Sequence, residues 1–281
     1  MQIIYDQYFA LKGLMAQVIG TYCSCCLICR ELMKDMADNN NNLFDRQILK
    51  LRRARAKKLG LEKFLYEILI DNLKFRLEEL NKNFENSVVI TPFLENFSYS
   101  IHHKSYEKFE DNEELDLKRK YDLIIHFLCL HWSNDPLGQL IQIKRSLNQG
   151  GMAVGYLFGE NTLNELRKSF AMAEISLENS LSARVSPMME LKSLGDLLSK
   201  AGFRDIVTDL ISQKVHYHSI AGLFSDLRRM GETNVLQKRT KSFLRRSTYN
   251  SMKKKYEEEF SNNDRKLMAT FDIICFTGWK I

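Results

Sequence analysis

The chain has 281 residues, of which 44% are hydrophobic and 27% charged, and its formal net charge is +6. This length allows one large domain with an extension or two small domains, and the composition is that of an ordinary globular protein. No stretch approaches the ~20 consecutive apolar residues that a membrane span requires. The first residues also lack the basic start of a secretory signal. These observations argue against a membrane-spanning protein and favour a location in the cytoplasm.

Four of the six cysteines lie close together near the start of the chain, at Cys23, Cys25, Cys26 and Cys29. Thiolates bind soft metals well, but this spacing is not a pair of C-x-x-C arms separated by a loop, and no histidine lies nearby. Packing of these side chains within an extension is therefore favoured over a metal site. The polar run 37–42 is typical of a linker before a helix start. We therefore divide the chain into an N-terminal extension and linker, residues 1–42, and a second unit, residues 43–281.

Two helices are predicted at the start of the second unit, within residues 43–81. The first covers residues 43–59 and is ended by Gly60. Its inward positions are predicted to be Phe44, Ile48, Leu51 and Leu59. The second helix covers residues 61–80, whose apolar residues recur at helical spacing.

The first of these helices is strongly basic between Arg46 and Lys58. Its positive side chains are Arg46, Lys50, Arg52, Arg53, Arg55, Lys57 and Lys58. A solvated helix face is the simpler interpretation, and a docking surface for a protein substrate or an assembly partner is the functional alternative. Aromatic residues are not interleaved with the charges, which argues against nucleic acid as the partner.

Strands and helices alternate in the rest of the chain. The run Tyr121–Phe127 is almost continuously apolar, as expected for a parallel strand covered on both faces, and Met152–Phe158 has the same character. A helix over residues 135–147 joins them, with Pro136 in its first turn. Other strands are predicted over residues 87–91, 206–211 and 270–277, and other helices over 162–177, 191–201, 219–230 and 242–260. This alternation predicts an α/β fold with a mostly parallel central sheet, in which Asp122–Phe127 and Met152–Phe158 are neighbours.

Ligands of an open α/β sheet bind beyond the carboxyl ends of its strands. The strand Tyr121–Phe127 leads into His131 and Trp132, so we expect both side chains at the mouth of the ligand crevice. A tryptophan face attracts a cationic ligand through its ring quadrupole. Alternatively, Trp132 only fills the corner between the strand and the next helix, with His131 as its polar cap.

Several stretches of the chain resemble one protein family. The central part of the type-11, class I S-adenosylmethionine (SAM)-dependent methyltransferases is similar to Asp122–Ile125, Leu130–Asp135, Leu140–Leu147 and Gly150–Gly151. The branch that contains alphaproteobacterial proteins and the arginine-modifying mitochondrial complex I assembly factor is similar to Leu43–Ala56, Arg184–Pro187, Asp226–Asn234 and Ala269–Trp279. The resemblance implies a Rossmann-like three-layer methyltransferase fold with N-terminal helices and SAM as the cofactor.

The resemblance also implies where the cofactor binds. The matching positions are Asp111, Phe127, Leu128, His131 and Trp132. Asp111, or its neighbour Glu110, matches the acidic end of the third strand, which contacts adenine in these enzymes. Glu95 and Glu107 are the candidates for the second-strand carboxylate that holds the ribose hydroxyls. No residue is assigned to catalysis, because methyl transfer depends mainly on positioning of the reactants.

One part of the family pattern is missing. These enzymes place an acidic, glycine-rich turn after the first strand, where backbone amides approach the cofactor closely. Here the first strand leads into Thr91-Pro92-Phe93, and no glycine occurs between Gly60 and Gly138. Residues 84–121 are also too few for a first helix and a full second strand. Two functions follow. The chain is either a SAM-dependent methyltransferase-like protein with a degenerate glycine loop, acting on a protein or small molecule, or a non-catalytic assembly or chaperone-like factor that has lost SAM binding.

Overall fold

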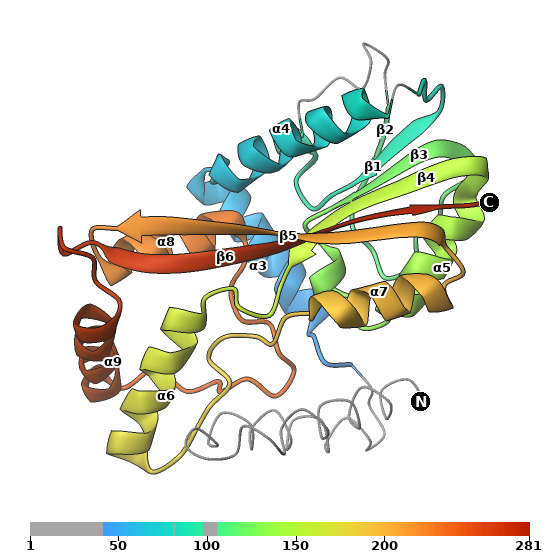
Figure 1. Ribbon diagram of the computed structural model, residues 1–281. Helices are drawn as coiled ribbons and strands as arrows, with labels where there is room; N and C mark the ends of the chain where they lie inside the picture. Colours follow the sequence, from blue (N-terminus) through green and yellow to red (C-terminus); the bar gives the residue numbers. More distant parts are fainter. Residues whose placement is uncertain (1–41, 81, 98–105) are drawn as a thin grey trace, which may run out of the picture.

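The computed structural model describes residues 42–80, 82–97 and 106–281 (Figure 1). The cysteine cluster at residues 23–29 and the predicted extension up to residue 41 lie outside the described residues. The predicted division of the chain into an extension, residues 1–42, and a second unit, residues 43–281, therefore stays a prediction. None of the described helices is long and apolar enough to cross a membrane.

The centre of the protein is a six-stranded sheet in the order β2-β1-β3-β4-β6-β5. The strands are β1 (Ser87–Ile90), β2 (Glu107–Phe109), β3 (Tyr121–Phe127), β4 (Leu147–Phe158), β5 (Arg204–Tyr217) and β6 (Leu267–Trp279). The neighbouring strands β2, β1, β3 and β4 are parallel, and β6 is antiparallel to both β4 and β5. Ile124 of β3 lies opposite Ala153 of β4. The predicted pairing of these two strands in a mostly parallel sheet is therefore confirmed.

Helices cover both faces of the sheet and give the protein three layers. They are α3 (Arg46–Leu59), α4 (Phe64–Glu79), α5 (Pro136–Ser146), α6 (Asn164–Glu178), α7 (Leu191–Lys200), α8 (Ile220–Met230) and α9 (Arg246–Glu259). Figure 1 shows α4 on one side of the sheet and α5 and α7 on the other. Successive residues of β3 point to opposite faces, so Ile125 packs in the core under α4 and Ile124 packs in the core with α5 and α7. The predicted three-layer fold is confirmed.

The first described helix, α3, begins later than predicted and buries a different face. Asp45 caps it by accepting a hydrogen bond from the Ile48 amide at 3.0 Å, and Gly60 ends it at a φ of 84°. Its buried residues are Leu49, Arg53 and Ala56. The prediction that Leu51 and Leu59 point inward is wrong, because these side chains are 64% and 50% exposed.

The residues just before α3 form extended backbone instead of helix. The Asp45 amide donates to the Val235 carbonyl at 2.8 Å, and the Gln237 amide donates to the Leu43 carbonyl at 2.9 Å. These two bonds fix the start of the described chain beside the segment that follows α8. Phe44 is thereby buried against Trp132, with ring centroids 5.1 Å apart in an edge-to-face arrangement.

The strands β2 and β5 differ most from the prediction, whereas β4 and β6 are only longer than predicted, at 147–158 and 267–279. The short strand β2 has polar residues and only three positions, too few for an alternating pattern to indicate it. It lies directly beside β1, and η1 (Leu94–Asn96) is the only helical turn between them in the described residues. The strand β5 extends from Arg204 to Tyr217, well beyond the predicted 206–211, because an edge strand tolerates the polar residues that interrupt its apolar pattern.

Candidate functional site

Two neighbouring regions lie at the carboxyl ends of the parallel strands, on either side of η2 (Leu130–Trp132). The first, which we call the crevice, is bounded by the residues that follow β1, β2 and β3, namely Thr91–Phe93, Asp111 and Leu128. The second, which we call the Glu232 cavity, lies between α6, α8 and the loops after them. The strand order reverses between β1 and β3, so the crevice is the position at which this class of sheet binds its ligand.

Aromatic side chains fill the crevice on the face covered by α4. Phe93 and Phe97 are 2% and 0% exposed. The Phe97 ring packs 5.3 Å from the ring of Phe127, and the Phe127 ring lies 5.1 Å from both Tyr66 and Tyr156. The Tyr66 hydroxyl is hydrogen bonded to the Thr91 hydroxyl at 3.2 Å. Side chains that follow β1 therefore occupy the space where the sheet ends.

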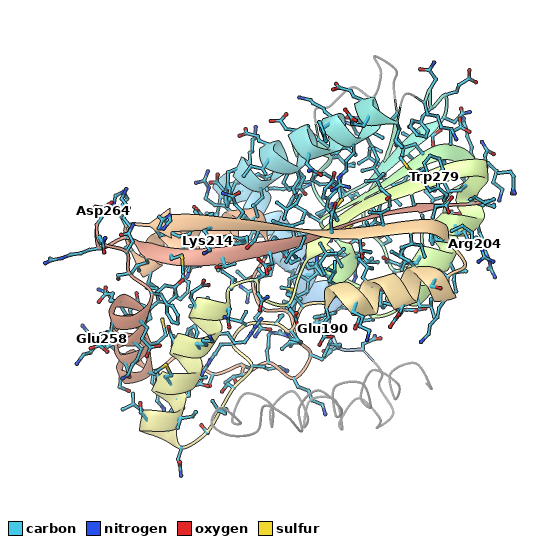
Figure 2. All side chains as sticks on the ribbon, viewed as in Figure 1. Glu190, Arg204, Lys214, Glu258, Asp264 and Trp279 are labelled. Atoms are coloured by element: carbon cyan, nitrogen blue, oxygen red, sulfur yellow. The ribbon has the colours of Figure 1, made fainter. Side chains whose placement is uncertain are left out.

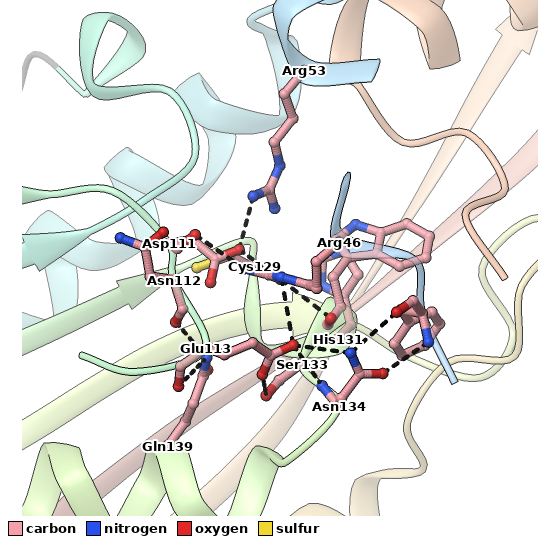
Figure 3. Close-up of polar contacts among 12 residues, drawn as sticks. Arg46, Arg53, Asp111, Asn112, Glu113, Cys129, His131, Ser133, Asn134 and Gln139 are labelled. Carbon is pink, nitrogen blue, oxygen red and sulfur yellow. Dashed lines mark hydrogen bonds and ion pairs between the residues drawn. The ribbon is translucent and has the colours of Figure 1, made fainter. Parts of the chain in front are cut away.

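Two arginines of α3 hold Asp111 at the polar side of the crevice (Figure 3). Arg53 Nη1 lies 2.8 Å and Arg46 Nη1 3.2 Å from Asp111 Oδ2, whose side chain is fully buried. Arg46 also donates to the Asp111 carbonyl at 3.0 Å and to the Trp132 carbonyl at 3.3 Å. Burial by itself raises the pKa of the Asp111 carboxyl, but Arg53 and Arg46 hold that pKa below its ordinary value. The predicted adenine-contacting carboxylate is thus an ion-pair partner of the chain itself.

A left-handed turn leads the chain from β3 into η2. Leu128 has a φ of 51°, which is strained for a leucine, and its amide is held by the Tyr156 carbonyl at 2.8 Å. This turn carries His131 and Trp132 away from the crevice and into the interior, where they are 4% and 1% exposed. Both residues, expected at the crevice mouth, therefore belong to the wall between the two regions.

His131 and Trp132 together hold the carboxylate of Glu232. Trp132 Nε1 donates to Glu232 Oε2 at 2.8 Å. The Phe158 amide lies 3.5 Å from His131 Nδ1, which leaves His131 Nε2 to carry a hydrogen toward Glu232 Oε2 at 3.1 Å. Two donors thus fix one oxygen of the carboxylate. The described residues make no hydrogen bond to its other oxygen.

The Glu232 cavity has a volume of ≈ 230 Å³. An apolar cavity of about 150 Å³ already admits a benzene-sized molecule, so there is room here for a side-chain-sized ligand. The walls are mostly apolar, with Trp132, Leu163, Leu166, Phe170, Val185, Met188, Phe224 and Leu227. The polar lining consists of Arg184, Ser186, Arg228, Glu232, Thr233 and Asn234. The Thr233 hydroxyl is buried with no hydrogen-bond partner in the described part of the chain.

Sequence stretches that are far apart in the chain meet around this cavity. Asn234 Nδ2 donates to the Arg184 carbonyl at 3.2 Å, which ties the loop after α8 to the loop after α6. Asn134 bridges to Phe44 on the other side, through both the amide and the carbonyl of that residue. Glu174 of α6 holds Arg184 at 2.7 Å. Three stretches that carry the family resemblance, around residues 132, 184 and 232, therefore line one cavity, and a fourth, around Phe44, packs against Trp132.

The other predicted cofactor residues lie elsewhere. Phe127 belongs to the aromatic cluster of the crevice, and Leu128 forms the turn above it. Glu95 is exposed and paired with Lys57 at 3.0 Å. Glu107 accepts a hydrogen bond from the Tyr121 hydroxyl at 2.8 Å and is the first residue of β2, whereas Asp111 follows the last residue of that strand. Within the described ranges, no group of three or more His, Cys, Asp or Glu side chains is placed to hold a metal ion.

The family is shown by comparison with known proteins. A family model described as a methyltransferase domain matches residues 31–208, and the chain belongs to this family. It is therefore a SAM-dependent methyltransferase-like protein, as the sequence predicts.

Three relatives show which members of the family this chain is similar to. The arginine-hydroxylase NDUFAF5 of zebrafish (Danio rerio) is 36% identical over 171 residues, which are 60% of this chain and 53% of that protein. The human protein of the same name is 37% identical over 171 residues, covering 60% and 49% of the two chains. A malonyl-acyl-carrier-protein O-methyltransferase of Xylella fastidiosa is 31% identical over 158 residues, covering 56% and 51%. The resemblance to the arginine-modifying branch is confirmed, and the chain spans about half the length of these curated relatives.

SAM, the cofactor that the family implies, does not fit the residues of the crevice as they stand. Pro92 has no amide hydrogen, and the Thr91 amide is already bonded to the Phe109 carbonyl at 3.1 Å. The first two positions after β1 thus offer no free backbone donor for an amino-acid carboxylate. Phe93 fills the same space with its ring, and Asp111 is committed to two arginines. We therefore derive no reaction step that passes through SAM.

The sequence did not single out Glu232. It lies within the stretch Asp226–Asn234 that resembles the family, but nothing in its spacing indicates that His131 and Trp132, about a hundred residues earlier, hold its carboxylate. The only indication of a role for Glu232 in the sequence was that it lies in the family-like stretch Asp226–Asn234. A buried carboxylate needs donors, and the residues of η2 are the polar side chains that the turn after β3 directs to it.

Proposed function

We propose that this methyltransferase-family protein binds an arginine side chain of a partner protein in the Glu232 cavity. The supporting observation is a carboxylate held by two donors on the wall of a cavity that is otherwise mostly apolar and aromatic. A guanidinium group pairs with a carboxylate, its plane stacks on aromatic rings, and its stem packs on apolar surface. The relatives named arginine-hydroxylase bear a name that refers to the same side chain.

The charges around the cavity favour a cationic ligand at Glu232. Arg184 is already neutralised by Glu174 at 2.7 Å, so it does not compete for a ligand. Arg228 is exposed and lies in the cavity lining. The buried negative charge of Glu232, with one oxygen left for a ligand, therefore attracts a guanidinium group deeper in the cavity.

We propose that the partner docks on the exposed basic residues of α3. Lys50, Arg55 and Lys58 are exposed, whereas Arg46 and Arg53 turn inward to Asp111. Arg52 is half-buried, its Nε has no partner among the described residues, and burial together with nearby Arg55, Arg239 and Arg228 lowers the pKa of its guanidinium. The positive surface of α3 thus continues to the cavity through Arg228. This continuity favours a partner that carries acidic residues next to its arginine.

The experiment is an NMR titration that watches the two tryptophan side chains. The sequence contains only Trp132 and Trp279, so the indole N–H region shows two signals. Trp132 lines the cavity, whereas Trp279 lies at the end of β6, away from α6 and α9 (Figure 2). Acetyl-arginine amide should move the Trp132 signal and leave the Trp279 signal in place.

Two controls make the titration specific. Acetyl-citrulline amide has nearly the same shape without the charge, and it should move the Trp132 signal at least tenfold more weakly, which corresponds to ~1.4 kcal/mol. Glu232→Gln should abolish the difference between the two ligands, whereas the exposed Glu114→Gln should not change it. Equal binding of arginine and citrulline amides by the unaltered protein would contradict the proposal, and preferential binding of malonate would indicate an acidic substrate instead.

A further inference from the structure

We propose that the chain itself closes the cofactor crevice: Arg53, held on Asp111, and Phe93 occupy the ligand position at the ends of β1 and β3, so the protein does not bind SAM there. This inference does not depend on the arginine proposal. It follows from the polar contacts, the packing and the topology of the crevice.

The topology shows that the crevice is smaller than the family pattern implies. Asp111 matches the acidic end of the third strand of these enzymes. In this protein it follows β2, which pairs directly with β1 through Val88 opposite Glu107 and Ile90 opposite Phe109. The described sheet therefore has no strand between β1 and the strand that leads to Asp111. The Asp111 carboxylate therefore lies one strand spacing, about 4.8 Å, closer to β1 than the family pattern implies. The space for a ligand between this carboxylate and β1 is lost.

The Oδ2 oxygen of Asp111 is paired within the protein, whereas its buried Oδ1 oxygen has no hydrogen-bond partner among the described residues. Arg53 is buried in α3 and reaches Asp111 Oδ2 at 2.8 Å, and Arg46 reaches the same oxygen at 3.2 Å. An arginine without this carboxylate would be an unpaired charge in the interior, which is strongly unfavourable. A ligand that took Asp111 Oδ2 from Arg53 would leave the arginine in that state. The pair thus acts as an internal occupant of the crevice.

The remaining space is filled from α8 as well. At Gly231, which ends α8 at a φ of 75°, an added Cβ would meet Phe93 Cζ at 3.1 Å and Arg53 Cγ at 3.4 Å. Phe93 and Arg53 therefore both pack against the end of α8, directly before Glu232 in the chain. A SAM molecule would have to displace a buried phenylalanine and break a buried ion pair.

The first test is isothermal calorimetry of the full chain with SAM and with S-adenosylhomocysteine. We expect no saturable binding of either molecule up to about 1 mM, the concentration that corresponds to a very weak complex. A dissociation constant near 1 μM would overturn the inference, because it requires a formed cofactor site. The arginine titration is read from Trp132 with a different ligand, so failure of one proposal is distinguishable from failure of the other.

The second test is a double-mutant cycle on the ion pair, read by thermal unfolding without any ligand. Asp111→Leu leaves Arg53 buried and unpaired, so it should lower the melting temperature by roughly 10 °C. The double variant Arg53→Met with Asp111→Leu should recover most of that loss, because both charges are then removed together. The same cycle on the exposed pair Asp116 and Lys118, whose side chains are each 75% exposed, should change the melting temperature by less than about 2 °C.

The cycle discriminates between an internal occupant and a cofactor ligand. If Asp111→Leu leaves the melting temperature unchanged while abolishing a measured affinity for SAM, Asp111 serves the cofactor and the inference is wrong. If Asp111→Leu lowers the melting temperature and Arg53→Met rescues it in the double variant, the carboxylate serves Arg53. Failure of the double variant to recover stability would also contradict the proposal, since the two charges would then not depend on each other.

Discussion

The crevice and the Glu232 cavity lie next to each other and share Trp132, yet they are built in opposite ways. On the crevice side, the Trp132 carbonyl accepts from Arg46, and rings and ion pairs fill the space. On the cavity side, the Trp132 indole donates to Glu232, and ≈ 230 Å³ is left between α6 and α8. The fold sets where a ligand of this family would bind, but the side chains decide whether space remains there. In this protein the space lies on the other side of η2.

The largest effect is expected from opening the crevice by truncating Phe97. Its ring is fully buried against Phe127 and Tyr106. Phe97→Ala should lower the free energy of unfolding by about 3–5 kcal/mol, as large-to-small changes in packed cores do. Urea unfolding measures this loss. Phe243→Ala, at a side chain that is 99% exposed, is the control and should change stability by less than about 0.5 kcal/mol. A loss below about 1 kcal/mol for Phe97→Ala would show that the crevice is already loosely packed.

The next effect is a dependence of stability on pH that comes from His126 at the end of β3. Burial lowers its pKa from 6.5 to about 4, against the opposing attraction of Asp111, and His131 and Arg46 add to the lowering. A pKa that is depressed in the folded state means that the stabilisation is complete above pH 6.5 and is lost as the pH falls toward 4. The shift corresponds to a loss on the order of 3 kcal/mol.

The variant His126→Gln isolates this contribution. Unfolding free energies at pH 7 and pH 4 should differ less in the variant than in the unaltered protein, by that same order of magnitude. The overall stability of the variant does not affect this test, because the quantity compared is the difference in unfolding free energy between pH 7 and pH 4. An unchanged difference would show that water reaches His126 and that the end of β3 is not closed.

A smaller effect is expected at the shared wall. Trp132→Phe keeps most of the packing against Phe44 but removes the indole donor to Glu232. The loss of one hydrogen bond to a charged group should cost about 2 kcal/mol in chemical unfolding. His131→Gln, which keeps a donor for the carboxylate, should cost less. If Trp132→Phe were neutral, Glu232 would not be held in the position that the arginine proposal needs.

The smallest effect is expected from enlarging a side chain of the cavity, compared with the same enlargement in the packed strand β1. Val185 lines the cavity and is half-buried, whereas Val89 lies fully buried in β1. Val185→Phe should change the stability by less than about 1 kcal/mol because there is space for the ring, whereas Val89→Phe should cost about 1–3 kcal/mol or more. Val185→Phe should also abolish the shift of the Trp132 signal with acetyl-arginine amide. Similar losses of stability in both variants would show that the cavity is packed as tightly as the core around β1.

The sequence was sufficient for the elements with a strong pattern. The strand β3 and the part Met152–Phe158 of β4 are nearly continuous apolar runs on either side of a capped helix, and such patterns depend only on residues near in the chain. The face of α3 was also present in the sequence, because Arg46, Leu49, Arg53 and Ala56 follow a spacing of three and four residues. Arginines are normally placed on the outer face, so this spacing was not taken as the buried one. Their carboxylate partner, Asp111, lies 58 residues beyond Arg53.

The site itself depends on contacts that no local pattern contains. Position 111 was selected through the family resemblance, and in this structure its carboxylate pairs with Arg53 and Arg46. Glu232 meets its donors across about a hundred residues, through the left-handed turn at Leu128. Such contacts depend on the order of the strands in the sheet and on the short connection from β1 to β2. They follow from three-dimensional packing, so the sequence predicted the class of protein and not the location of its open site.

The most direct measurement is a crystal structure of the full chain in the presence of both SAM and acetyl-arginine amide. We expect electron density for the arginine ligand in the Glu232 cavity, with its guanidinium group at the Glu232 carboxylate. Phe93, Arg53 and Asp111 should keep the contacts described here, with no ligand density between β1 and β3. Density for an adenosyl group at the ends of these strands, with Phe93 or Arg53 displaced, would contradict the account.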